Sequence, residues 1–175
     1  MSAPLRGVKV LDLSRLLPGP ACTWLLQGMG ASVDRVESAG RGDPARHLPP
    51  FVEGVGAYFA ALSRGKRSIA LDLRSEAGRD TLAQLVPHYD VLVEGFKPGV
   101  LEAMGLTRER IEELHPGLIV ARLSGFGQHG PLRDQPGHDL NYAGLAGVLG
   151  QAPGAAPPAA PPVQTGDLAG AMLAA

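Results

Sequence analysis

The feature of this sequence that most constrains its fold is an alternation of short apolar runs with segments of helical spacing. The apolar runs are rich in Val, Ile and Leu and cover residues 8–13, 32–37, 68–73, 90–94 and 118–123. Helical spacing appears in the intervening residues 20–29, 57–64, 76–86 and 100–114. Strands separated by helices of this length are typical of βαβ units. We therefore expect an α/β fold with a mostly parallel sheet and helices on both faces.

Composition excludes several classes of protein. The 16 Lys and Arg balance 17 Asp and Glu, which disfavours nucleic acid as a partner. No apolar run reaches the length of about eighteen residues that spans a bilayer, and residues 1–6 do not resemble an export signal. We therefore expect no membrane partner and a cytoplasmic location. A single cysteine, Cys22, and five histidines without zinc-enzyme spacing predict neither a disulfide nor a metal site.

Two segments near the end of the sequence have distinct compositions. Residues 151–162 contain five prolines in twelve positions, which predicts a surface loop. Residues 163–175 place Leu168, Met172 and Leu173 at helical spacing, without a capping glycine or a proline to end the pattern. We expect this helix to continue beyond the last residue, so that the chain is part of a longer domain.

Residues 125–130 match the spacing GxGxxG and follow a predicted strand. That motif binds a dinucleotide where it opens a helix whose N-terminus receives the pyrophosphate. Here Pro131, Pro136 and Gly137 follow, which disfavours a helix. The sequence predicts a flexible loop that approaches a ligand. The chain also lacks the GxSxG motif of serine hydrolases.

Two titratable residues near the predicted helix starts are candidates for chemistry. His138 precedes an apolar, small-residue segment at 143–149, and a helix N-terminus there favours a neutral imidazole and can hold a negatively charged oxygen. Asp139 is the natural cap of that helix. Asp167 stands at the start of the last helical segment. Because a lone histidine is usually structural and such an aspartate is usually an N-cap, both roles stay open on spacing alone.

Basic residues flank the ends of several predicted strands and do not form one run. They are Lys66, Arg67, Arg74 and Lys97. They form either a solvated rim or a set of point charges for a phosphate-bearing ligand. In the second case, Leu71 and Phe96 offer apolar surface to an adenine.

Several motifs in the same order resemble the family III CoA-transferase and α-methylacyl-CoA racemase superfamily. They are residues 7–15 (GVKVLDLSR), 18–21 (PGPA), 28–37 (GMGASVDRVE), 42–43 (GD), 58–59 (YF), 65–73 (GKRSIALDL), 90–99 (DVLVEGFKPG) and 124–131 (SGFGQHGP). Together they cover the whole chain and are more specific than any one motif. The resemblance implies that residues 1–175 are the N-terminal part of a CoA-binding, Rossmann-like large domain, and that two full-length chains interlock as a homodimer.

The resemblance also implies catalytic roles. Asp167 matches the family's catalytic aspartate, and His138 in GHDLNY matches the histidine of the racemase branch. In the transferases the carboxylate attacks an acyl-CoA thioester and forms a mixed anhydride. In the racemases the two residues act as an acid/base pair that inverts an α-carbon through an enolate. His138, and Leu17 in place of the glutamine of oxalate-type transferases, favour the racemase.

Our main prediction is therefore a racemase acting on a 2-methylacyl-CoA, with a CoA-transferase as the alternative and an inactive CoA-binding or dimerisation fragment as the third. No permanently bound cofactor is expected, since coenzyme A enters as part of the substrate. The matching CoA contacts are Leu71, Asp72, Leu73 and Arg74 at the adenine end, Gly95, Phe96 and Lys97 at the next turn, and Gly137, Asp139, Leu140, Asn141 and Tyr142 along the pantetheine and thioester.

Two departures weaken this match. Ser38 and Ala103 stand where relatives commonly have arginines that meet the CoA phosphates. Arg35, Arg41 and Arg46 are candidates to replace them.

Overall fold

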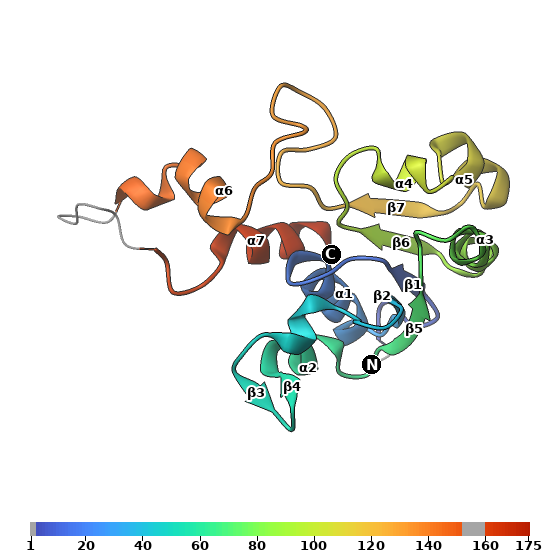
Figure 1. The fold of residues 1–175 in the computed structure, drawn as a ribbon, viewed down its shortest axis with the longest axis horizontal. Coiled ribbons are helices and arrows are strands. Elements are labelled where there is room, and N and C mark those ends of the chain that lie inside the picture. Colours follow the sequence, from blue (N-terminus) through green and yellow to red (C-terminus); the bar gives the residue numbers. More distant parts are fainter. Residues whose placement is uncertain (1–2, 152–159) are drawn as a thin grey trace.

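The five apolar runs form one parallel sheet, which confirms the predicted α/β class. We describe a computed structural model that defines residues 3–151 and 160–175 (Figure 1). Each run holds one strand: β1 (Lys9–Asp12), β2 (Ser32–Ser38), β5 (Arg67–Leu71), β6 (Val91–Glu94) and β7 (Ile119–Arg122). All neighbouring pairs are parallel, in the order β5-β2-β1-β6-β7.

Helices cover both faces of this sheet. The helices of the described residues are α1 (Pro18–Gly28), α2 (Ala57–Ser63), α3 (Glu76–Leu85), α4 (Val100–Ala103), α5 (Arg108–Leu114), α6 (Asp139–Leu145) and α7 (Thr165–Ala174), of which α6 packs against α7 away from the sheet. Short 3-10 turns lie at Pro44–His47, Val86–His88 and Val148–Gln151. On one face, α1 and α7 pack together, as Figure 1 shows, and on the other α3, α4 and α5 pack against the sheet. The strands therefore lie between two apolar clusters, as expected for a parallel sheet.

Alternation along the central strands explains why the runs are continuously apolar. Val10 and Val93 point into the cluster with α1 and α7, whereas Leu11 and Leu92 point into the cluster with α3 to α5. All four side chains are fully buried. Because successive residues of a strand face opposite sides of the sheet, apolar residues at two successive positions of these strands pack into both clusters.

The strand order reverses between β1 and β6. The chain first builds β1, β2 and β5 to one side and then returns to add β6 and β7 on the other. In parallel α/β sheets such a reversal leaves a crevice outside the carboxyl ends of the two central strands, and ligands bind there. This topology places the loops after Asp12 and Glu94 at the crevice.

A short hairpin was not predicted from the sequence. Residues 51–56 form a hairpin of β3 (Phe51–Val52) and β4 (Val55–Gly56), with strands too short to show a periodic signal. Glu53 and Gly54 at its tip both have positive φ, as a type I′ turn requires. Most of the Pro/Ala-rich segment predicted as a surface loop, residues 152–159, lies outside the described residues.

A buried carboxylate fixes the loop that follows β1. Asp43 accepts hydrogen bonds from the backbone N–H of Leu16 (3.0 Å) and of Ala45 (2.7 Å) and forms an ion pair with Arg35. Leu16 adopts a left-handed conformation with φ of 62°, which is unfavourable for a residue with a Cβ. The bond from its N–H to Asp43 helps to hold it there.

Replacing Asp43 with alanine is expected to destabilise the fold by about 3 kcal/mol or more, because it leaves the buried Arg35 guanidinium without its anionic partner. The midpoint of urea unfolding measures the change. Asp80→Ala, at an exposed position of α3, is the matched control and should stay within about 0.5 kcal/mol of the wild type. An unchanged midpoint for Asp43→Ala would contradict this role.

The low pKa of Glu37 predicts how the stability of the fold depends on pH. Burial raises the pKa of its carboxyl, but hydrogen bonds from Arg46, Ser68 and the backbone N–H of Asp43 outweigh burial and lower the pKa from 4.5 to about 2. This contribution to stability, up to about 3 kcal/mol, is complete above pH 4.5 and is lost as the pH falls toward 2. Urea unfolding between pH 2 and 7 should show a smaller acid loss for Glu37→Gln than for the wild type. Glu113→Gln, at an exposed site, should retain the wild-type slope.

Candidate functional site

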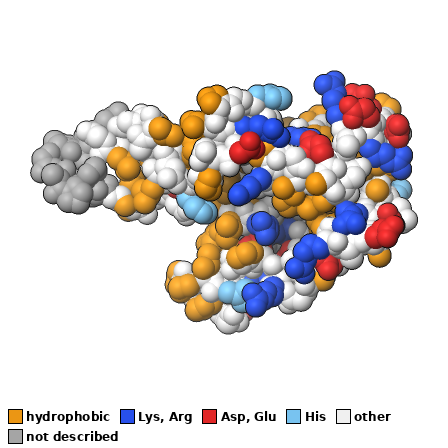
Figure 2. Space-filling view, turned by 45° about the horizontal axis from the view of Figure 1, so that its top comes forward, with side chains coloured by type: hydrophobic (Ala, Val, Ile, Leu, Met, Phe, Trp, Pro, Cys, Tyr) orange, Lys and Arg blue, Asp and Glu red, His pale blue; other side chains and the backbone are white. Residues whose placement is uncertain are grey.

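A cavity of about 920 Å³ lies at the carboxyl edge of the sheet. Its walls come from residues 15–18 after β1, 95–98 after β6 and 122–126 at the end of β7, and α6 and α7 contribute further lining residues. In Figure 2, Lys and Arg side chains gather near the middle of the face shown. The cavity therefore lies where the strand order reverses, the position at which α/β sheets bind ligands.

Asp167 lines this cavity from the first turn of α7. Its side chain is half-buried, and Gln164 Nε2 donates a hydrogen bond to its Oδ2 at 3.1 Å. The helix is held in place by Ala171, which packs with Ala21 and Cys22 of α1. The carboxylate thus stands at the start of a helix that is anchored on the sheet.

His138 lines the same cavity from the N-terminus of α6. The helix begins earlier than its apolar pattern predicts, because Asn141 Oδ1 accepts the backbone N–H of His138 at 2.9 Å and closes the first turn. His138, and not Asp139, therefore occupies the N-cap position. The structure thus brings His138 and Asp167 to one cavity, although 28 residues separate them in sequence.

Asp139 faces the other helix and not the cavity. Its side chain is buried, and Oδ1 accepts hydrogen bonds from the backbone N–H groups of Gly166 (2.7 Å) and Asp167 (3.1 Å). A Cβ atom at position 166 would lie 3.1 Å from this oxygen, so only glycine allows the approach without displacement. Leu140 and Asn141 are exposed and are also not among the residues that line the cavity. Of the predicted pantetheine segment, Gly137 and Tyr142 do line it.

The surroundings of Asp167 raise its pKa. Burial is the main cause and the charge of Asp139 adds to it, while His138 acts in the opposite direction. The charge of Asp167 also acts on two tyrosines. Burial and the charges of Asp43 and Asp167 raise the pKa of Tyr58 to about 12. Burial, and to a smaller extent the charge of Asp167, raises the pKa of Tyr142. At neutral pH both are therefore neutral O–H donors. Asp167 is more basic than a carboxylate in water, which suits a nucleophile or a proton acceptor.

Two glycines make room for Tyr142. A Cβ atom at Gly125 would lie 2.2 Å from the tyrosine hydroxyl, and one at Gly137 would lie 2.7 Å from its ring. Phe126 packs edge-on against the same ring, with 5.3 Å between centroids. Residues 125–130 form a loop and do not open a helix, as predicted. Gly125, the first glycine of the GxGxxG pattern, thus makes room for the Tyr142 side chain.

The turn after β6 is held by another buried carboxylate. Glu94 accepts the backbone N–H of Phe96 at 2.6 Å, and burial raises its pKa. Gly95, Phe96 and Lys97 all line the cavity. Arg122, at the cavity wall, donates to Glu102 at 2.5 Å, so its charge is partly neutralised.

The segment predicted for the adenine end lies farther along the sheet edge. Residues 71–74 follow β5 and do not line the cavity. Leu71 and Leu73 pack against the apolar cluster that Phe96 also contacts. Arg74 is exposed and pairs with Asp72 at 3.1 Å. The two predicted segments therefore flank one cluster at the carboxyl edge without sharing a cavity.

The basic residues proposed from the sequence divide into buried and exposed groups. Arg35 is 2% exposed and paired with Asp43, so it cannot replace a phosphate-binding arginine. Arg46 is bound by both oxygens of Glu37 at 2.7 Å, and Lys66 is buried under α1, where its Nζ donates to Thr23 Oγ1 at 2.6 Å. Of the three arginines considered as replacements, only Arg41 is exposed.

Several residues of the cavity wall were not predicted from the sequence. Tyr58 and Arg15 line the cavity, although the motifs that contain them do not predict this position. Gln164 was also unassigned, although its amide contacts the candidate nucleophile. Their proximity depends on long-range packing, and no local pattern signals it.

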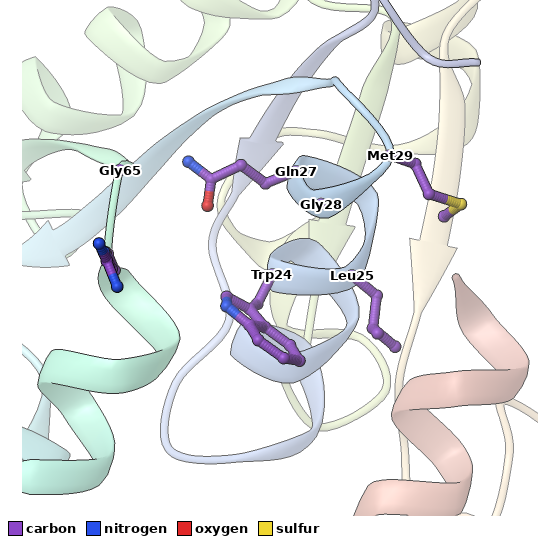
Figure 3. A pocket seen from close by; sticks show the side chains of 7 residues that line it. Trp24, Leu25, Gln27, Gly28, Met29 and Gly65 are labelled. Atoms are coloured by element: carbon purple, nitrogen blue, oxygen red, sulfur yellow. The ribbon is translucent and has the colours of Figure 1, made fainter. Parts of the chain in front are cut away.

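A second cavity, of about 550 Å³, lies on the outer side of α1 (Figure 3). It is lined by Trp24, Leu25, Gln27, Gly28, Met29, Arg64 and Gly65. None of these residues carries a carboxylate, imidazole, hydroxyl or thiol. The cavity beside Asp167 is therefore the stronger candidate for chemistry.

Other types of site are less supported in the described parts of the chain. Within residues 3–151 and 160–175, no three acidic, His or Cys side chains are grouped as metal ligands, and no helix has the length and apolar character needed to cross a membrane. Burial, reinforced by Asp12, raises the pKa of Cys22 to about 11, so its thiol is a poor nucleophile at neutral pH.

Comparison with known proteins connects this geometry to a family. Over 152 residues the chain is 43% identical to the succinyl-CoA–D-citramalate CoA-transferase of Chloroflexus aurantiacus, covering 86% of this chain and 36% of that protein. It is 40% identical over 147 residues to the human succinyl-CoA:glutarate CoA-transferase, and the match covers 83% of this chain and 34% of the human protein. The chain thus spans about a third of the length of these relatives.

Structural comparison agrees. The crystal structure of a CaiB/BaiF family protein from Brucella suis matches 99% of this chain and 48% of that chain, with a TM-score of 0.90 and 36% identity. The family model for CoA-transferase family III matches residues 5–175. The protein therefore belongs to CoA-transferase family III.

Proposed function

We propose that the protein transfers coenzyme A between carboxylic acids, with Asp167 as the nucleophile. The observation that carries this proposal is the half-buried Asp167 carboxylate on the wall of the crevice cavity, in a chain of this family. The names of the relatives above pair succinyl-CoA, the thioester of a dicarboxylic acid, with D-citramalate or glutarate, which are dicarboxylates. We infer a dicarboxylic acid as one substrate.

The chemistry begins when an Asp167 oxygen attacks the carbonyl carbon of the thioester. A C–O bond forms, the C–S bond breaks, the CoA thiolate leaves and a mixed anhydride remains. The CoA thiolate then attacks the Asp167 carbonyl carbon of the anhydride, the first acid leaves as a carboxylate, and an Asp167–CoA thioester forms. The second acid's carboxylate displaces the thiolate from this thioester to give a new mixed anhydride, and attack of the thiolate on its substrate carbonyl forms the new acyl-CoA and releases Asp167. Neutral donors near the carbonyl would stabilise the oxyanion of each tetrahedral intermediate, and Tyr58 and Tyr142 are candidates because they line the cavity and interact electrostatically with Asp167.

The CoA moiety is proposed to extend from the cavity along the sheet edge. Gly95, Phe96 and Lys97 line the cavity and would contact the pantetheine arm. Residues 71–74 then lie beyond them toward the adenine, as the family resemblance implies. The cytoplasmic location and the interlocked homodimer also stay predictions from the sequence.

Racemisation is the second candidate, although the sequence favoured it. Both of these relatives are CoA-transferases, which supports transfer over racemisation. The observation that keeps a racemase in consideration is His138, which lines the cavity that Asp167 also lines. Racemisation needs both groups, one on each face of the α-carbon, whereas transfer needs only the carboxylate.

Asp167→Asn is expected to lower CoA transfer from succinyl-CoA to glutarate by at least about 10³-fold, because it removes the nucleophile while keeping the side chain's shape. His138→Asn should have a much smaller effect. Chromatography of the CoA thioesters over time measures both. Asp80→Asn is the matched control for the loss of one negative charge on an exposed surface.

The racemase is tested in parallel with a 2-methylacyl-CoA in deuterated water and no acceptor acid. α-Deuterium uptake that requires both His138 and Asp167, without CoA transfer, would replace the transferase with the racemase. A thermal shift with CoA but neither reaction would instead indicate a binding module.

A further inference from the structure

A buried carboxylate joins the N-termini of the two helices that carry the candidate catalytic residues. Asp139 is the first residue of α6 and is 5% exposed. Its Oδ1 receives the backbone N–H groups of Gly166 and Asp167, at 2.7 and 3.1 Å. These N–H groups belong to the first turn of α7, where helical amides have no partner within the helix. Asp139 is thus the side chain that satisfies them.

We propose that Asp139 is a positioning residue for Asp167: by binding the first turn of α7, its carboxylate sets the direction in which the nucleophile faces the cavity. This inference rests on the proposed function. Asp139 itself does not line the cavity, so it acts through Asp167 and not on the substrate.

The local packing shows how tightly this link is built. Gly166 has no Cβ, and one placed there would lie 3.1 Å from Asp139 Oδ1 and 3.5 Å from Tyr142 Cβ. The helix starts therefore approach each other at a glycine. Gln164, one residue before α7, donates a hydrogen bond from Nε2 to the Asp167 side chain at 3.1 Å. The nucleophile is held through its own backbone by Asp139 and through its carboxylate by Gln164.

A carboxylate at this place has an electrostatic effect that an uncharged acceptor lacks. Asp139 disfavours ionisation of the neighbouring Asp167, while His138 favours it. The other titratable groups near Asp167 are Tyr58 of α2 and Tyr142 of α6, both neutral at physiological pH. Asparagine at position 139 would keep an acceptor oxygen and remove the charge, so it separates the two effects.

The test compares Asp139→Asn, Asp139→Ala and the control Asp80→Asn in the full protein. Asp139→Ala should lower kcat for CoA transfer by about 10²-fold with little change in KM for the acyl-CoA, because the nucleophile is displaced. The amides of Gly166 and Asp167 should lose protection from hydrogen exchange. Asp139→Asn should keep most of that protection and move the acidic limb of the pH–rate profile to lower pH. NMR titration should show that the pKa of the Asp167 carboxyl is lower in Asp139→Asn than in the wild type.

An unmoved acidic limb in Asp139→Asn, or wild-type kcat in Asp139→Ala, would overturn the inference. The inference would also be overturned if both variants lost the same activity, lost folded protein in proportion, and kept the acidic limb of the pH–rate profile unmoved. Asp139 would then have only a structural role. If the wild type transfers no CoA, the proposed function fails. Amide protection and the Asp167 titration then still decide whether Asp139 holds and tunes that carboxylate.

Discussion

The ion pair between Arg35 and Asp43 supports the loop after β1, which forms part of the cavity wall. Both groups are almost completely removed from water, which is costly unless each charge is paired and the remaining lone pairs are satisfied. Asp43 meets this condition by binding the N–H groups of Leu16 and Ala45 as well as Arg35, so it joins the loop after β1 to the 3-10 turn at Pro44–His47. The loop that begins the cavity wall is therefore held by backbone hydrogen bonds that an apolar side chain at position 43 could not accept.

The same physical solution recurs around the crevice. Glu94 satisfies the N–H of Phe96, and Asp139 satisfies two N–H groups at the start of α7. Backbone that turns sharply at a sheet edge or begins a helix leaves donors without partners, and a buried donor without a partner is unfavourable. Buried carboxylates fill that need here. Because each one is bound to backbone, it orders a loop or helix start that lines the cavity.

This explains which features the sequence could predict. The five strands and the helices between them follow from periodicity, which is local and is fixed by burial on both faces. The placement of His138 and Asp167 in one cavity was expected only through resemblance to a family. The burial of Arg35 and the turning of Asp139 toward α7 were not anticipated, since both depend on partners far away in sequence. A charged residue near a strand end looks the same in sequence whether it meets a ligand or a buried partner.

The lining of the cavity bears on the choice between transfer and racemisation. A dicarboxylic acid presents a second carboxylate that needs a cation, whereas a branched fatty acyl group needs an apolar wall. Arg15 and Lys97 line the cavity together with Leu17 and Leu48, and Arg122 is already engaged by Glu102. Arg15 directly follows the loop residue Ser14 and precedes the strained Leu16, so its position is governed by the Asp43 link. Arg15 is thus a cation of the cavity wall whose neighbouring backbone is held by the same buried ion pair.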